Sequence, residues 1–400
     1  MTLHYDFPEN ITLGEVKNII KDNPNFILVD KGDYTVANYV RSGNDTHPPV
    51  VDRNTAILRE LRGLIFDSFT GEVISRRYQK FFNLGEREDV TNIGVSRNHI
   101  ILTKLDGSLV TAFKSHNDNL YWGTKMGVTD VAEQALKFIS DKNNYIEFAN
   151  MSIDEGFTPI FEWVSNKQRI VLNYPKDDLV LVAMRNNKTG HYLPYEAITI
   201  NAMRYGINYV PSYGIKRLSS DNLNDNDNTE NKILEFKNLI KLLENEEGVV
   251  ILFDNGHMIK LKSDWYVSLH RAKSLLENER AVVGIVLDNG EDDLYPLLSE
   301  EDKGRLSNFS KGLWEDIFAM ESKVNSNLRN SNEMNRKDFA LSIVDQSPSF
   351  RSLSFLGFDK KKIEISEITD IIRRRLGSKR TFDQCNDIIK IKWKEIKLDE

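Results

Sequence analysis

The spacing of apolar residues changes once along the chain, close to residue 264, and this change limits the folds that the sequence can adopt. Before it, short runs of β-branched and aromatic residues alternate with turn residues, a pattern typical of strands. After it, longer amphipathic stretches dominate, for example Lys311 to Leu328 and Lys361 to Leu376. We therefore predict an α+β domain over residues 1–263 and an all-helical C-terminal domain over residues 264–400. Residues 219–231 are too polar to pack and are predicted to form an exposed loop.

The overall charge and the single cysteine exclude several classes of protein. The chain has 53 Lys+Arg against 60 Asp+Glu, a net charge of -7, which argues against a protein whose whole surface binds nucleic acid. A local basic groove is still compatible with this balance. Cys385 has no partner for an internal disulfide, and the cysteine and histidine spacing lacks the pattern of a zinc finger. The N-terminus lacks the apolar segment of a signal peptide, and no stretch is long enough to span a bilayer. We therefore expect a cytoplasmic protein with no membrane partner.

One lysine lies at a position where a strand meets a turn. The segment from Asn98 to Phe113 is typical of a strand, a tight turn at Asp106-Gly107 and a second strand, and it places Lys104 at the end of the first strand. The short pattern Lys-x-Asp-Gly is weak by itself, and an ordinary hairpin with an exposed lysine would explain it as well. What favours a functional lysine is the set of charged residues around it in the sequence, in an order that suits nucleotidyl transfer.

Two carboxylates and two lysines follow in apolar segments. Glu162 stands between two aromatic residues, and in a regular strand it points to the opposite face from both, although a solvent-facing charge is the simpler explanation. Glu247 precedes an apolar strand. Lys260 and Lys262 share one face of the next strand, where a bound anion would relieve their repulsion. A solvated edge strand is the alternative for this pair.

Further cations precede Lys104 or follow it closely. Arg62 stands beside a glycine at the start of an apolar run, and Lys125 lies between two glycines. Lys80 and Phe82 belong to a segment that mixes cations with aromatic residues. Such a mixture suits phosphate contact together with base stacking, although either phenylalanine of this segment could belong to the core.

Taken together, these residues resemble a known superfamily. The chain resembles the covalent nucleotidyltransferases, which include ATP-dependent ligases and messenger-RNA capping enzymes, in four motifs that stand in the same order: Lys104-Leu-Asp-Gly-Ser, Phe161-Glu-Trp, Glu247-Gly-Val-Val and Lys260-Leu-Lys262. The longer string from Lys260 to His270, with Leu61-Arg-Gly and Gln79-Lys-Phe-Phe-Asn, resembles the tRNA-repairing ATP-dependent RNA ligase family of T-even phages. The resemblance extends over most of the body and is weak beyond about residue 300.

The resemblance implies a fold, a reaction and a set of site residues. It implies an ATP-grasp-like nucleotidyltransferase domain of antiparallel sheets and helices. In this family a lysine attacks the α-phosphate of ATP to form lysyl-AMP, the AMP passes to an RNA 5′-phosphate, and an RNA 3′-hydroxyl displaces it. Lys104 matches the nucleophile, which must be neutral to attack; clustered cations and exclusion of water favour that state. Residues that match the ATP and AMP contacts of the family are Arg62, Lys80, Phe82, Lys125, Glu162, Lys260, Lys262 and Tyr266.

The resemblance also implies a divalent metal. Glu247 matches a metal-binding residue, and Asp292 matches a residue of the metal site, with the adjacent Asp293 as an alternative. We expect Mg²⁺, with Mn²⁺ as a substitute, because a hard ion prefers oxygen ligands and retains water.

The expected partner is RNA, specifically a tRNA nicked in its anticodon loop. We expect a monomer, in the cytoplasm of the host cell if the chain is phage-encoded, whose helical domain selects the tRNA. A basic run over residues 360–380 either contacts the tRNA body or forms a solvated helix face. A DNA ligase or capping enzyme is disfavoured because helices are expected after Lys262, where those enzymes have a β-barrel. An inactive RNA-binding homologue is disfavoured because every expected reactive position is occupied.

Overall fold

The computed structural model describes residues 7–40, 46–86, 98–166, 171–216, 237–331 and 333–395. The chain divides into two compact units, Met1–Val267 and Ser268–Glu400. The boundary lies within helix α8 (Asp264–Leu276), whereas the sequence placed it just before this helix. The loop predicted at 219–231 lies outside the described residues.

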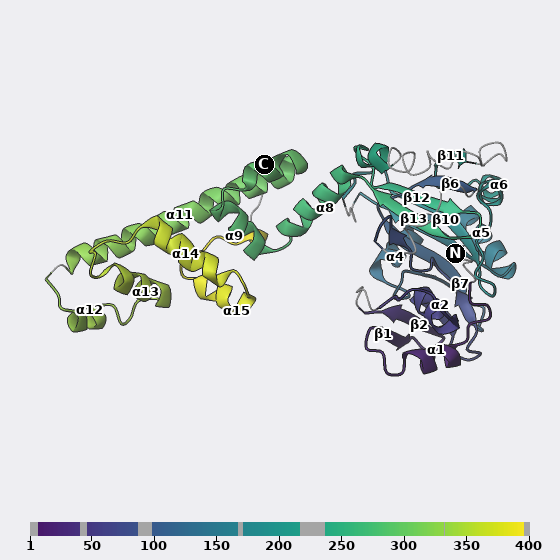
Figure 1. Ribbon diagram of the computed structural model, residues 1–400, viewed down its shortest axis with the longest axis horizontal. Helices are drawn as coiled ribbons and strands as arrows, with labels where there is room; N and C mark the ends of the chain where they lie inside the picture. Colours follow the sequence, from purple (N-terminus) through teal and green to yellow (C-terminus); the bar gives the residue numbers. More distant parts are fainter. Residues whose placement is uncertain are drawn as a thin grey trace. The chain divides into compact units, whose positions relative to one another are not determined.

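Strands in the described part of the first unit form three sheets, which can be followed in Figure 1. The first sheet is antiparallel, with the order β1-β2-β3-β4: β1 Phe26–Asp30, β2 Tyr34–Tyr39, β3 Arg62–Asp67 and β4 Val73–Ser75. The second is also antiparallel, with the order β10-β9-β7-β8: β7 Ser108–Lys114, β8 Leu120–Gly123, β9 Phe157–Val164 and β10 Asp178–Asn186. The third has the order β11-β6-β12-β13-β5, with only β13 and β5 parallel among its described pairs: β5 Phe82–Asn83, β6 His99–Thr103, β11 Ser212–Lys216, β12 Gly248–Phe253 and β13 Met258–Lys262.

Amphipathic helices cover the first two sheets. Helices α1 (Leu13–Ile20) and α2 (Arg53–Glu60) pack their apolar residues on the first sheet. Helices α4 (Asp130–Ile139), α5 (Asn143–Asp154) and α6 (Tyr195–Tyr205) pack on the second sheet. In α4 the buried residues recur three and four positions apart, which is why this sequence forms a helix with one apolar face.

The third sheet packs on the second, and this contact positions the site. Ile100 and Leu102 of β6 meet Val164 of β9 and Val180 of β10 in one apolar cluster. Strands β12 and β13 form a hairpin around the turn Asp254-Asn-Gly256, a sequence typical of such turns. Along β13 Met258, Ile259 and Leu261 are buried and the two lysines are only partly buried, so Lys260 and Lys262 share a face as predicted.

The described part of the second unit consists of helices and loops. The long helix α11 (Glu300–Asn330) places an apolar stripe, from Leu306 to Leu328, at the centre of the core of this unit. The other helices are α9 Glu279–Leu287, α10 Glu291–Leu294, α12 Arg336–Ser342, α13 Pro348–Gly357, α14 Ile365–Arg375 and α15 Lys379–Phe382, with short 3-10 turns at Tyr295–Leu297, Asp383–Cys385 and Trp393–Glu395. The predicted α+β body and helical C-terminal region are thus confirmed. No helix among the described residues is long and apolar enough to cross a membrane.

Candidate active site

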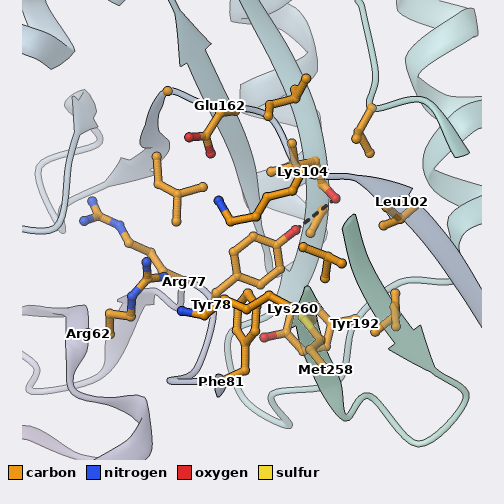
Figure 2. A pocket seen from close by; sticks show the side chains of 18 of the residues that line it. Arg62, Arg77, Tyr78, Phe81, Leu102, Lys104, Glu162, Tyr192, Met258 and Lys260 are labelled. Carbon is orange, nitrogen blue, oxygen red and sulfur yellow. Dashed lines mark hydrogen bonds between the residues drawn. The ribbon is translucent and has the colours of Figure 1, made fainter. Parts of the chain in front are cut away.

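A cavity of about 500 Å³ opens in the first unit, lined on one side by β6, β12 and β13 and on the other by β7, β9 and β10. Figure 2 shows the side chains of Lys104 and Lys260 extending in the same direction, toward the guanidinium groups of Arg62 and Arg77. Residues predicted from the sequence that line this cavity are Arg62, Lys80, Lys104, Lys125, Glu162, Lys260 and Lys262. The structure therefore brings together side chains from positions 62 to 262 of the chain.

Lys104 lies where the chain passes from the third sheet to the second. Strand β6 pairs with β11 and β12, whereas β7 pairs with β8 and β9, so the two strands do not form a hairpin. The connection from Lys104 to Gly107 instead passes from the third sheet to the second and faces the cavity. A Cβ atom at Gly107 would lie 2.3 Å from the carbonyl oxygen of Trp163, so only glycine fits this close approach.

The buried carboxylate of Asp106 holds this connection in place. It accepts hydrogen bonds from the backbone N–H groups of Val171 (2.8 Å) and Leu172 (2.7 Å) and from the hydroxyl of Tyr266 (2.8 Å). The backbone N–H of Asp106 in turn donates a hydrogen bond to the hydroxyl oxygen of Tyr174 at 2.9 Å. Tyr266 does not line the cavity, and its contact with Asp106 supports the turn that carries Lys104.

Glu247 binds two of the predicted lysines at once. Its Oε2 lies 2.7 Å from Lys104 Nζ, and its Oε1 lies 2.8 Å from Lys262 Nζ. The Glu247 side chain is 3% exposed, whereas those of Lys104 and Lys262 are 22% and 31% exposed. The free site thus holds a buried carboxylate whose two oxygens each face an ammonium group.

The surroundings shift the pKa values of Lys260 and Glu162 in opposite directions. Burial, followed by repulsion from Lys80, lowers the pKa of Lys260 to about 8. Burial raises the pKa of Glu162 to about 8; attraction to Lys104 opposes this shift and repulsion from Glu247 adds to it. The aromatic neighbours of Glu162 in β9 are buried in the core on the other face of the strand, as the alternation predicted. Shifts of this size are typical of functional sites.

A second group of cations surrounds Tyr39, which also lines the cavity. The ammonium groups of Lys80 and Lys125 lie 5.7 and 5.4 Å from the centre of its ring. Burial by itself raises the pKa of Tyr39, but Arg62, Lys125 and Lys80 together bring it below its ordinary value. No sequence pattern singles out this tyrosine, because its strand lies outside every motif.

Phe82 and Asp292, like Glu247 and Tyr266, are not among the residues that line the cavity. Phe82 is buried in the core of the third sheet, 5.5 Å from Lys80 Nζ, and it is the adjacent Phe81 that lines the cavity. The resemblance implies a nucleotide contact for Phe82, whereas the residue pattern by itself is compatible with either phenylalanine in the core, so the role of Phe82 stays a prediction. Asp292 is an exposed residue of α10 in the second unit, as is Asp293, so their metal role stays a prediction.

A buried ionic network, which the sequence analysis did not predict, supports the segment between β4 and β5. Glu60 accepts hydrogen bonds from Arg76 (2.9 Å) and Arg185 (2.7 Å), and all three side chains are almost fully buried. Burial would raise the pKa of Glu60, but the two arginines hold it below its ordinary value. Arg185 also donates to the Arg77 carbonyl and to the Gln79 side chain, so the network fixes the backbone just before Lys80.

Chemically, the cavity suits a ligand that is both anionic and partly apolar. Its cationic side chains would bind phosphate groups. The apolar part of its lining, which includes Val182, Val210, Leu252 and Met258, would cover a planar base. Within the described residues, no group of three or more His, Cys, Asp and Glu side chains could hold a metal ion by itself. These features suit a phosphorylated nucleotide bound next to a lysine.

Comparison with known proteins agrees with this class of site. Residues 60–266 match a family model described as RNA ligase. This match covers more than half of the chain and includes every predicted site residue except Asp292. The chain therefore belongs to this RNA ligase family.

The individual relatives have low sequence identity to this chain. A candidate RNA ligase of Thermovibrio ammonificans is 27% identical over 326 residues, covering 78% of this chain and 80% of that protein. RNA ligase 1 of bacteriophage TS2126 is 24% identical over 257 residues, covering 60% of this chain and 58% of that protein. A solved archaeal ATP-dependent RNA ligase has 14% identity and a TM-score of 0.45, over 91% of this chain and 80% of that chain.

Proposed function

We propose that this RNA ligase uses ATP, that it joins RNA 5′-phosphate and 3′-hydroxyl ends through lysyl-AMP and RNA-adenylate intermediates, and that Lys104 carries the AMP. The observation that carries this proposal is the position of Lys104 at the crossing between two sheets, paired with Glu247 and facing the cavity beside Lys260 and Lys262. The membership of the RNA ligase family supports the same chemistry.

In the first step, the lone pair of neutral Lys104 Nζ forms a bond to the α-phosphorus of ATP. The bond from that phosphorus to the bridging oxygen breaks, and pyrophosphate leaves. In the free site Lys104 is an ammonium paired with Glu247, so it must lose a proton to solvent and leave this pair before it attacks. Lys260 and Lys262 then balance the negative charge that develops on the α-phosphate.

In the next two steps the AMP moves from protein to RNA and is released. An oxygen of the RNA 5′-phosphate bonds to the AMP phosphorus, and the electron pair of the broken bond returns to Lys104. The RNA 3′-hydroxyl oxygen then bonds to the 5′-phosphorus, loses its proton and displaces AMP. The cations around Tyr39, namely Arg62, Lys80 and Lys125, are suited to hold the phosphates in these steps.

The residues present fit a magnesium or manganese ion that is shared with the substrate. Mg²⁺ commonly binds through one or two carboxylates and the substrate's phosphates, not through a complete protein cage. Glu247 would hold the ion here in place of its two ammonium partners. When bound, the ion would neutralise phosphate charge.

We further propose that the natural substrate is tRNA cleaved in its anticodon loop and that the second unit contributes to its selection. The protein should be incubated with labelled ATP and then offered nicked DNA, single-stranded RNA and cleaved tRNA in competition. The proposal predicts sealing of RNA ends, with cleaved tRNA preferred. Preferential sealing of nicked DNA would contradict the RNA assignment, and equal use of both RNA substrates would contradict the tRNA assignment.

A further inference from the structure

Arg77 is a buried cation at the wall of the cavity with an incomplete set of partners. The residue is 3% exposed, and it lines the cavity. Its Nε donates to Thr111 Oγ1 and its Nη2 donates to the carbonyl of Gly123, each at 2.9 Å. Its Nη1 has no hydrogen-bond partner, and no carboxylate of the described residues forms an ion pair with the guanidinium.

Two neighbouring buried arginines, unlike Arg77, have a carboxylate counter-ion within the protein. Arg76 and Arg185 both pair with the carboxylate of Glu60. An unpaired charge in a protein interior is strongly unfavourable. Arg77 therefore lacks in the free site the kind of counter-ion that its two neighbours have within the protein.

Arg77 lies next to Arg62 and Lys125, two of the residues that are predicted to contact phosphate. Gly63 follows Arg62 and has φ +80°, and a Cβ atom at this glycine would lie 2.8 Å from Arg77 Nη1 and 2.6 Å from Lys125 Cα. The guanidinium thus packs against the backbone that carries Arg62 and Lys125. Burial and repulsion from Arg62 lower the pKa of Arg77 to about 9, so the local charge is positive and uncompensated.

We propose that Arg77 is a further anion-binding residue of this site and that a phosphate group of the substrate is its counter-ion. The proposal rests on the proposed function for the source of that phosphate, which is either the pyrophosphate end of ATP or the 5′-phosphate of RNA. Arg77 acts on either one by its fixed positive charge behind Arg62 and Lys125. Its two existing hydrogen bonds hold that charge in place.

The experiment compares Arg77→Met, which removes the charge, with Arg77→Lys, which keeps the charge but loses the guanidinium geometry. Apparent affinities for inorganic pyrophosphate are measured by ligand-induced thermal stabilisation. Affinities for 5′-phosphorylated and 5′-hydroxyl RNA are measured in parallel by direct binding. In at least one phosphate arm, the methionine variant should bind about tenfold more weakly than wild type or worse, and the lysine variant should stay close to wild type. 5′-Hydroxyl RNA should bind all three proteins alike.

The measurements with pyrophosphate and with 5′-phosphorylated RNA identify which phosphate is the counter-ion of Arg77. Weakening with pyrophosphate alone assigns the counter-ion to ATP, and weakening with 5′-phosphorylated RNA alone assigns it to RNA. Wild-type affinity of the methionine variant in both arms would overturn the proposal. Equal losses in both variants would also overturn it, because they would indicate a structural role of the hydrogen bonds to Thr111 and Gly123.

Two further controls keep the result decisive. If Arg77→Met does not fold, Arg77→Gln replaces it as the neutral variant. Transfer of AMP from ATP to the wild-type protein is tested separately. Loss of that reaction would contradict the proposed function, whereas the pyrophosphate comparison would still decide the role of Arg77.

Discussion

At the scale of single residues, the site depends on how a few charges are shared. Glu247 divides its two oxygens between Lys104 and Lys262, while Lys260 has no such carboxylate partner among the described residues. Lys104 and Lys262 therefore share Glu247, and Lys260 is the lysine whose pKa the surroundings lower most clearly, to about 8.

The two strand lysines should be needed for the first step. Because they balance charge on the α-phosphate, Lys260→Ala and Lys262→Ala should each slow transfer of AMP to the protein by about 100-fold. The rate is measured with labelled ATP at saturating Mg²⁺. Lys114→Ala is a matched control on β7, where the lysine pairs with Asp118 and Asp154, and it should react normally. Normal rates in the Lys260 and Lys262 variants would remove their proposed role.

Glu162 should make stability depend on pH. Its pKa in the folded protein, about 8, lies above the ordinary value, so the unfolded chain releases this proton at lower pH than the folded protein does. The folded state is therefore favoured at low pH and loses this advantage as the pH rises from about 4.5 to 8. Relative to Glu162→Gln, wild type should become less stable across this range and change little above it, as measured by urea unfolding at each pH. A constant difference would show that folding does not raise the pKa of Glu162.

Sequence patterns identified most of the cavity's cations but not their surroundings. Lys104, Glu162 and the Lys260–Lys262 pair could be selected because strand alternation and motif order are visible in the chain. Arg77 could not be distinguished from Arg76 by sequence, since both precede the same aromatic segment. Only the fold shows that one of them pairs with Glu60 and the other packs behind Gly63.

At the scale of elements, the buried network around Glu60 joins three distant segments. It connects the end of α2, the segment before β5 and the strand β10. Through the Arg77 carbonyl and Gln79, the network fixes the backbone that leads to Lys80. Neutralising Glu60 leaves Arg76 and Arg185, which are buried, without this counter-ion.

Loss of this carboxylate should therefore be costly. Glu60→Gln should lower the free energy of unfolding by about 3–5 kcal/mol, measured by chemical denaturation. The matched control is Glu15→Gln, which breaks an exposed pair with Arg53 and should cost less than about 1 kcal/mol. Similar small losses in both variants would mean that the buried network contributes little to stability.

The elements themselves were largely predictable, but their partners were not. The two strands that flank Lys104 and the hairpin at Asp254-Asn-Gly256 follow from local patterns, whereas the tight turn predicted at Asp106-Gly107 is instead a connection between two sheets. A local pattern cannot tell whether two successive strands pair with each other. Here β6 and β7 join different sheets, and this long-range choice opens the cavity beside Lys104.

At the scale of the whole molecule, the question is what the helical unit adds to the ligase unit. Part of the basic run is used within the unit, because Arg373 pairs with Asp288 and Lys360 pairs with Glu367. Arg374, Lys379 and Arg380 are exposed and form no ion pair within the described residues. These three are the members of the run best suited to contact RNA.

Charge reversal of the exposed members tests the proposed role in tRNA selection. The combined variant Arg374→Glu, Lys379→Glu and Arg380→Glu should reduce sealing of cleaved tRNA about tenfold or more, because phosphate contacts contribute charge-dependent affinity. Joining of short single-stranded RNA should change less than about twofold, since few phosphates of a short strand would reach this unit. A matched control reverses exposed cations elsewhere in the unit: Lys311, Arg329 and Lys337. Equal losses on both substrates, or an equal effect of the control, would contradict a selective role.

The most direct test is to locate the AMP on the protein. Wild type and Lys104→Ala are incubated with labelled ATP and Mg²⁺, the pyrophosphate is removed, and the modified residue is identified by mass spectrometry of peptides. We predict one AMP on Lys104 of the wild type, released when 5′-phosphorylated RNA is added, and no label on the variant. AMP on another residue, or full labelling of Lys104→Ala, would contradict the proposal that Lys104 is the nucleophile.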